Sequence, residues 1–175
     1  MKIKHVKTWK LNELPEDTKQ KAIEKLYDIN IEFGDWWDQI YEDAADVGIK
    51  ITSFNIDRGS CCEGVIYDFV ETAQKIIKNH GELCETYLTA NNYLEDRAKL
   101  VEKYSDGIET DIVTEDNEYD FDLECDDLDE EFKKSILEDY RIILSKNYEY
   151  LTSKEAIIET IEANDYDFDV NGNIF

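Results

Sequence analysis

Hydrophobic side chains along most of the chain recur every three or four residues, which is the spacing of amphipathic helices. The single proline, several aspartates and Thr152, which favour helix starts, precede these stripes, and Gly48 and Gly81 follow two of them at the position where glycine commonly ends a helix. The pattern therefore predicts helices over much of the chain. Their predicted starts are Pro15, Asp35, Asp68, residue 82, Asp126 or Asp127, and Thr152.

Shorter stretches alternate between apolar and polar residues and predict β-strands. Residues 2–11 form one such stretch, and residues 49–56 and 61–67 form a predicted hairpin around the turn at 58–60. Asn171-Gly172 near the end of the chain is a strong signal for a second tight hairpin. These elements predict an α+β fold, with a small antiparallel sheet and hairpins packed against several amphipathic helices, in a single domain over residues 1–175.

Residues 105–125 interrupt the helical pattern and predict a long loop. Within it, the apolar residues Tyr119, Phe121, Leu123 and Cys125 alternate with acidic residues. This period of two predicts a strand with one wholly acidic face, followed by the helix that Asp126 or Asp127 begins. We therefore expect an acidic loop or strand segment at residues 105–131.

Charge makes this segment stand out further. The chain has 175 residues, 43 of them acidic and 19 basic, for a net charge of -24. Residues 106–131 hold 14 acidic side chains and no basic one, so more than half of the net charge lies there. A field of this sign repels nucleic acid and anionic lipid and attracts basic partners or cations. We therefore expect no direct binding to nucleic acid or to a membrane.

No targeting or disulfide pattern is present. The N-terminal residues do not form the apolar core of a signal peptide, and no run is apolar and long enough for a transmembrane helix. The spacing of Cys61, Cys62, Cys84 and Cys125 does not suggest a disulfide framework. We expect a cytoplasmic protein.

Metal sites and catalytic sets are weakly supported. A zinc site at Cys62, His80 and Cys84 lacks a C-x-x-C pair and a fourth ligand, so buried structural thiols are the better explanation. The ending Asp167, Asp169, Asn171, Gly172 and Ile174 matches part of a calcium-binding EF-hand loop but lacks its final glutamate. The two histidines lie in different elements, and no hydrolase or P-loop motif is present. We therefore expect no metal, no cofactor and no enzymatic activity.

The acidic segment is the best candidate for a functional site. On one strand face, side chains repeat every ~6.6–6.8 Å, close to the spacing of phosphates along a nucleic-acid strand. Such a row suits a protein surface that grips phosphates, whose Arg and Lys side chains supply affinity and steering. A solvated acidic loop that aids solubility is the open alternative. The predicted partner-binding residues are Asp111, Glu115, Asp116, Glu118, Asp120, Asp122, Glu124, Asp126, Asp127, Asp129 and Glu130, with Glu131 beside them.

Three stretches resemble a family of small acidic proteins of bacteriophages and mobile elements: residues 29–58, Asn79-His80-Gly81 with residues 84–87, and residues 148–164. The family is similar to anti-defence (anti-CRISPR) proteins, in particular phage inhibitors of Cas9-type nucleases. The resemblance implies inhibition by protein–protein contact inside a host bacterial cell. It assigns no inhibitory residue in this chain.

These observations lead to one principal hypothesis. The protein binds a basic, nucleic-acid-gripping surface of a host nuclease or other nucleic-acid-binding protein, acts as a DNA mimic, and obstructs DNA binding or cleavage. Two alternatives stay open: a non-catalytic phage interaction module whose acidity serves solubility, and a calcium-binding protein.

Overall fold

The computed structural model describes residues 7–32, 34–105 and 115–175, with side chains for all of these except residues 105 and 115–119. Within these ranges the chain forms six α-helices and a two-stranded antiparallel sheet, which confirms the α+β class with a small sheet. The chain divides into two compact units. The first comprises Met1–Trp36 and Ser145–Phe175, and the second comprises Trp37–Leu144.

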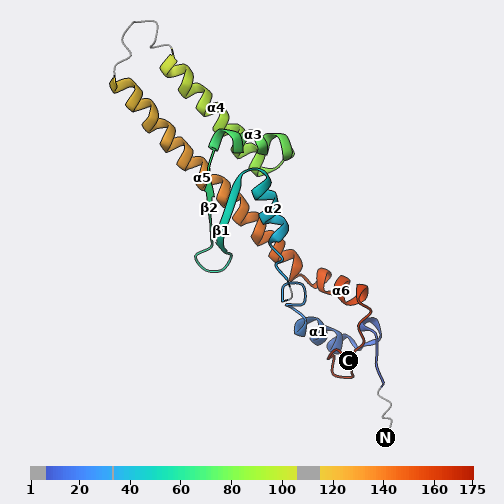
Figure 1. Cartoon of the computed structure of the whole chain (residues 1–175). Helices are drawn as coiled ribbons and strands as arrows, with labels where there is room; N and C mark the ends of the chain where they lie inside the picture. Colours follow the sequence, from blue (N-terminus) through green and yellow to red (C-terminus); the bar gives the residue numbers. More distant parts are fainter. Residues whose placement is uncertain (1–6, 33, 106–114) are drawn as a thin grey trace. The chain divides into compact units, whose positions relative to one another are not determined.

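The helices are α1 (Glu16–Lys25), α2 (Asp38–Asp46), α3 (Phe69–Asn79), α4 (Glu85–Ser105), α5 (Glu115–Leu151) and α6 (Lys154–Ala163). A short 3-10 helix, η1 (Leu11–Glu13), precedes α1, and the strands are β1 (Ile49–Asn55) and β2 (Cys61–Ile66). Figure 1 shows these elements along the chain. Helix α5 is the longest and contributes residues to both units.

The predicted hairpin of the second unit is confirmed. Strands β1 and β2 pair antiparallel from Ile49 opposite Ile66 to Asn55 opposite Cys61, with a register irregularity between Ile51 and Ser53. Gly48, between α2 and β1, has φ +99°, which side chains rarely tolerate. The connection between α2 and β1 therefore favours glycine at position 48.

Strand β2 packs closely against α5. A Cβ atom on Gly64 would lie 2.8 Å from Leu137 Cδ2 and 3.0 Å from the Lys50 carbonyl oxygen. Because real Cβ atoms do not approach other atoms this closely, the absence of a side chain at Gly64 permits the contact. The hairpin and α5 share a core that includes the buried residues Ile49, Ile66 and Ile136.

Helices α4 and α5 run antiparallel, side by side (Figure 1). Rising residue numbers in α4 meet falling numbers in α5: Thr89 contacts Asp139, Tyr93 contacts Phe132, and Lys103 contacts Glu124. Buried positions three or four residues apart on both helices line this seam, among them Ala90, Tyr93, Phe132 and Ile136. The pair is therefore a helical hairpin that buries one face of each helix.

The first unit has its own small core. Ile23 of α1, Ile157 and Ile161 of α6, and Phe168 are buried together. Phe168 forms isolated β-bridges with both Trp9 and Ile174, so the chain reverses direction at Asn171-Gly172 as the sequence predicts. Gly172 has φ +75°, and a Cβ there would lie 2.9 Å from the Thr18 carbonyl oxygen.

Several predicted boundaries shift. The predicted N-terminal strand lies partly outside the described residues, and Trp9 within it makes only an isolated bridge. Helix α1 ends at Lys25, earlier than predicted, because Asn30 turns away to donate to the Leu151 carbonyl (2.8 Å) and to accept from the Thr160 hydroxyl (2.6 Å). Helix α2 begins at Asp38 rather than at the predicted cap Asp35.

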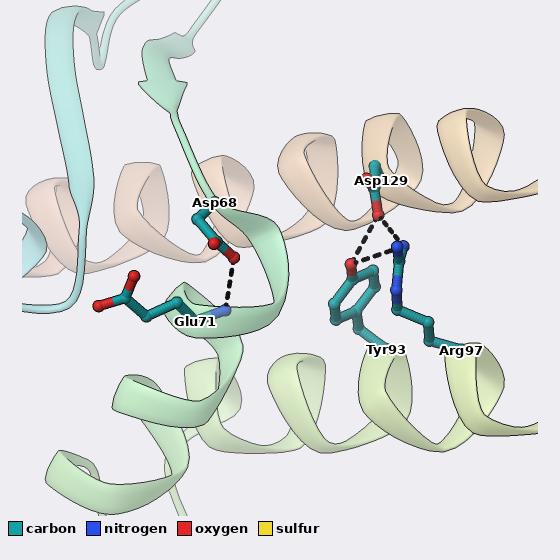
Figure 2. Close-up of polar contacts among 5 residues, drawn as sticks. All are labelled: Asp68, Glu71, Tyr93, Arg97 and Asp129. Atoms are coloured by element: carbon teal, nitrogen blue, oxygen red, sulfur yellow. Dashed lines mark hydrogen bonds and ion pairs between the residues drawn. The ribbon is translucent and has the colours of Figure 1, made fainter. Parts of the chain in front are cut away.

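The helix caps show the same mixture of agreement and correction. The Asp68 carboxylate accepts from the Glu71 backbone N–H at 2.8 Å, which confirms the predicted start of α3 (Figure 2). Ser153, not Thr152, caps α6 by accepting from Ala156 N–H. The Thr152 hydroxyl instead donates to the Tyr148 carbonyl at 2.8 Å, so it is engaged at the end of α5.

Candidate functional site

The predicted strand within residues 105–125 is wrong, because residues 115–151 form the single helix α5. The positions that turn inward are Phe121, Cys125, Leu128, Phe132 and Ile136, which follow one another at helical intervals. Leu123, which a strand would place beside Phe121 and Cys125, is half exposed (50%) on the outer surface of the helix. The predicted helix start at Asp126 or Asp127 is wrong for the same reason.

The helix rearranges the carboxylates of the predicted site. They no longer form one row with a period of two, because successive residues of a helix differ by roughly 100° around its axis. The exposed acids instead spread over roughly half of the helix circumference between residues 120 and 131, a rise of about 16 Å along the axis. We call these exposed residues the acidic face; they are Asp120, Asp122, Asp126, Asp127, Glu130 and Glu131.

Two of the predicted partner-binding residues are instead engaged within the helical hairpin. Asp129 accepts from Arg97 Nη1 at 2.8 Å and from the Tyr93 hydroxyl at 2.6 Å, and only 19% of its side chain is exposed (Figure 2). Glu124 accepts from Lys103 Nζ at 2.7 Å and from the Tyr104 hydroxyl at 2.8 Å. Both carboxylates therefore join α4 to α5.

These contacts also change the ionisation of the groups. Burial and the hydrogen bond to Asp129 raise the pKa of Tyr93, so the phenol stays protonated and donates. Hydrogen bonds from Lys103 and Tyr104 lower the pKa of Glu124. The Glu124 tether is thus formed by an ionised carboxylate at neutral pH.

The acidic face is largely free of such internal partners. Among the residues the structure describes, the hydrogen bonds and ion pairs of the face consist of one contact, between Glu130 and Lys133 at 3.4 Å. Lys133 and Lys134 lie at the C-terminal end of the face. The unpaired carboxylates therefore remain available to an external basic group.

The remaining predicted residues cannot be placed fully. Asp111 lies outside the described residues. Glu115, Asp116 and Glu118 lie in the first turn and a half of α5, where the structure describes the backbone but not these side chains. The continuous helix nevertheless places their backbone on the same element as the acidic face.

The oxygens of the calcium-like ending are engaged in its own turn. The Asp169 carboxylate accepts from the backbone N–H groups of Asn171 (2.8 Å) and Asn173 (2.9 Å) and from Asn173 Nδ2 (2.8 Å). These bonds lower the pKa of Asp169. The Lys25 ammonium donates to Asn173 Oδ1 and to the Asn171 carbonyl, so a protein cation already contacts two of the oxygens.

The residues of the rejected zinc interpretation do not gather either. His80 Nδ1 lies 2.8 Å from Thr86 Oγ1, and Cys84 is exposed. Burial, together with Cys61, Glu138 and Glu63, raises the pKa of the Cys62 thiol to about 11, which disfavours the thiolate that binds zinc. Across the described ranges, no group of three or more His, Cys, Asp or Glu side chains is arranged to hold a metal ion.

A partly buried polar cluster in the second unit, centred on the half-exposed Asp43, has no signal in the sequence. Tyr140 donates to Asp43 Oδ2 at 2.9 Å, and His80 Nε2 lies 3.6 Å from Asp43 Oδ1. Burial and the neighbouring Asp43 raise the pKa of Tyr140. Because Thr86, the hydroxyl beside His80, is only 2% exposed, the cluster does not present a nucleophile to solvent, and we interpret it as a polar tether in the core.

Comparisons with known proteins give no match: no family model, no curated protein and no solved structure is similar to this chain. The resemblance to phage proteins therefore stays a prediction. Among the helices in the described ranges, none combines the length and apolar character needed to cross a membrane.

Proposed function

We propose that this protein is a non-enzymatic inhibitor that uses the acidic face of α5 to occupy a basic surface of a nucleic-acid-binding protein. The observation that carries the proposal is the exposure, on one rigid helix, of six carboxylates with almost no internal ion pairs. Surfaces that grip phosphates present Arg and Lys side chains at close spacing. An acidic helix offers such a surface negative charges, as the phosphates of its nucleic-acid ligand do.

The helix provides geometry that a flexible acidic tail lacks. Tethers from Arg97 to Asp129 and from Lys103 to Glu124 hold α5 against α4 below the acidic face. Because the helix already orders the backbone that carries the exposed carboxylates, binding costs less conformational entropy than it would for a disordered acidic tail, so more of the interaction free energy appears as affinity. The long-range field of a chain of net charge -24 speeds the encounter with a basic partner.

We propose that the target is a guide-loaded Cas9-type nuclease of a bacterial cell and that the protein acts there as an anti-defence (anti-CRISPR) factor. Effectors of this type hold nucleic acid in positively charged channels. The resemblance to phage anti-defence proteins, and the complementarity of charge, support this choice. Occupation of the channel by α5 would exclude target DNA and prevent cleavage.

The test compares two variants with equal net charge. In the face variant, five exposed acids of α5 become amides: Asp120→Asn, Asp122→Asn, Asp126→Asn, Asp127→Asn and Glu130→Gln. In the control variant, five exposed acids of the first unit are changed in the same way: Asp28→Asn, Glu149→Gln, Glu155→Gln, Glu159→Gln and Glu162→Gln. Binding to the guide-loaded nuclease and inhibition of DNA cleavage are measured at about 0.1 M salt, with circular dichroism to verify folding.

We expect the face variant to bind at least about tenfold more weakly and the control variant to bind like the wild-type protein. Equal loss in both variants would mean that net charge, not the acidic face, determines binding. If both variants inhibit as well as the wild-type protein does, the acidic residues serve solubility and not binding. If the wild-type protein binds none of a panel of guide-loaded nucleases and restriction endonucleases, the proposed target class is wrong.

A further inference from the structure

A pocket of about 280 Å³ lies between α4 and α5, beside the acidic face. Each helix contributes four residues at the spacing i, i+3, i+4, i+7, so one stripe of each helix forms one wall. The wall from α4 consists of Thr89, Asn92, Tyr93 and Asp96, and the wall from α5 consists of Leu128, Glu131, Phe132 and Ser135. The pocket is smaller than the cavities that hold drug-sized ligands, and its size suits a single side chain.

Two stacked aromatic rings contribute to the lining of the pocket. The rings of Tyr93 and Phe132 are both buried and stack with centroids 4.4 Å apart. The Tyr93 hydroxyl donates to Asp129 and accepts from Arg97, so it is already engaged within the helical hairpin (Figure 2). Leu128 adds a half-buried aliphatic surface.

The rim of the pocket breaks the charge pattern of the helical hairpin. Lys103 faces Glu124 across the seam. Asp96, seven residues or about two turns earlier in α4, and Glu131, seven residues later in α5, both line the pocket. Opposite charges thus pair between the helices at Lys103 and Glu124, whereas two carboxylates from opposite helices line the pocket, an arrangement that attracts a cation.

The fold supplies little compensation for these two carboxylates. Asp96 contacts the exposed Lys99 of its own helix at 2.7 Å, an exposed pair that contributes little. In the part of the chain that the structure describes, Glu131, Asn92 and Ser135 make no hydrogen bond or ion pair, and no Lys or Arg lines the pocket. The rim therefore offers two anions, an amide and a hydroxyl to an incoming donor.

We propose that this pocket accepts an arginine side chain of the basic partner. The guanidinium is a planar cation with five N–H donors, which suits carboxylates on opposite walls with an amide and a hydroxyl between them. The aliphatic stem of the arginine packs on Leu128 and the edge of Phe132. This inference rests on the proposed function, because it names the anchor residue of the partner that the acidic face attracts.

The test titrates the full-length, ¹⁵N-labelled protein with L-argininamide and follows the backbone amides by NMR. We expect saturable shifts confined to residues 89–96 and 128–135. L-citrullinamide, which has the same shape without the charge, should bind at least about tenfold more weakly. Shifts scattered over the whole acidic surface, equal binding of lysinamide, or displacement of argininamide by calcium chloride at lower concentration would overturn the assignment.

Matched variants locate the site. Asp96→Asn with Glu131→Gln should weaken argininamide binding at least about tenfold, and Glu95→Gln with Glu149→Gln, which changes exposed acids of the same helices outside both this pocket and the acidic face, should leave it unchanged. The first pair of substitutions removes like charges, so its thermal unfolding temperature should not fall. Equal binding by both variants would overturn the proposal.

The nuclease assay separates this proposal from the proposed function. If the five-amide variant of the acidic face loses inhibition while Asp96→Asn with Glu131→Gln retains it, the pocket proposal is wrong and the proposed function stands. If argininamide binds the pocket but the five-amide variant inhibits fully, the proposed function is wrong and the pocket is an arginine site for another purpose.

Discussion

At the scale of single residues, identical carboxylates have different roles because their surroundings differ. Asp127 and Asp129 lie two residues apart on α5, yet Asp127 faces solvent and Asp129 is held by Arg97 and Tyr93. An exposed acid contributes little to folding, whereas a partly buried hydrogen-bonded ion pair leaves a cation and a hydroxyl unsatisfied when it is broken.

Asp129→Ala should therefore lower the free energy of unfolding by about 2 kcal/mol, because it removes two charge-assisted hydrogen bonds. Asp127→Ala is the control and should change it by less than about 0.5 kcal/mol. Urea unfolding followed by circular dichroism measures both. Similar losses for the two variants would contradict the tether.

Asp139 provides a pH-dependent prediction. Burial raises the pKa of this carboxyl, opposed in part by the Thr89 hydroxyl, which donates to Oδ2 at 2.7 Å. The folded state thus binds the proton more tightly than the unfolded state does, so ionisation at neutral pH opposes folding. Asp139→Asn keeps the acceptor for Thr89 and should raise the free energy of unfolding at pH 7.

This gain should shrink as the pH falls from the raised pKa of Asp139 in the folded state towards the ordinary pKa of an aspartate, and it should vanish below that ordinary value, where the wild-type carboxyl is protonated in both states. Urea unfolding of both proteins between pH 7 and pH 3.5 measures the difference. A gain that is constant across this range would mean that the carboxyl does not titrate as burial implies.

At the scale of elements, α5 shows why one apolar pattern allowed two interpretations. Phe121 and Cys125 are inward in either a strand or a helix, because four residues fit both periods. Leu123 distinguishes the two interpretations, because a strand would bury its side chain and the helix leaves it half exposed. The sequence within residues 119–125 is too short to decide, and packing against α4 decides it.

Leu123→Gln should accordingly change the free energy of unfolding by less than about 1 kcal/mol, since Leu and Gln have similar helix propensity and the site is half exposed. Phe132→Ala on the inner side should cost about 3–5 kcal/mol. Thermal unfolding of both variants tests the orientation of α5. A large loss for Leu123→Gln would instead support the strand.

Strand β2 allows an analogous test with cysteine chemistry. Cys61 is exposed, and its neighbour Cys62 points to the other face of the strand and has a pKa raised to about 11 by burial. Iodoacetamide at pH 8 should modify Cys61 and the exposed Cys84 first and Cys62 and the buried Cys125 slowly. Peptide mass mapping over time measures the order, and equally rapid modification of Cys62 would contradict the packing of β2.

At the scale of the whole molecule, the excess of acidic side chains opposes folding. With 43 acidic and 19 basic residues, repulsion outweighs the surface ion pairs, and salt screens it. The free energy of unfolding should increase as sodium chloride rises from about 20 mM to about 0.5 M, when the Debye length falls well below 10 Å.

Thermal unfolding over this salt range measures the effect, with potassium chloride as a control for ion-specific binding. The five-amide variant of the acidic face should gain less from salt than the wild-type protein, because it carries fewer repelling charges. A melting temperature that falls with salt would show that ion pairs, such as those of Arg97 and Lys103, outweigh the repulsion.

Much of this protein follows from the sequence alone. Local signals are sufficient where neighbouring residues determine the structure: the Asp68 cap, the glycine at residue 48, the hairpin of β1 and β2, and the reversal at Asn171-Gly172. The concentration of 14 acids without a base is likewise a property of the sequence.

The tertiary structure decided which of those acids are exposed. Arg97 and Asp129 are 32 residues apart, and Asp43 and Tyr140 are 97 apart, so no local pattern pairs them. The helical state of residues 119–125 depends on burial against α4, and the pocket depends on two stripes that meet only when the helices are antiparallel. Local sequence fixes backbone preference and charge, whereas the pairing of distant side chains requires the completed fold.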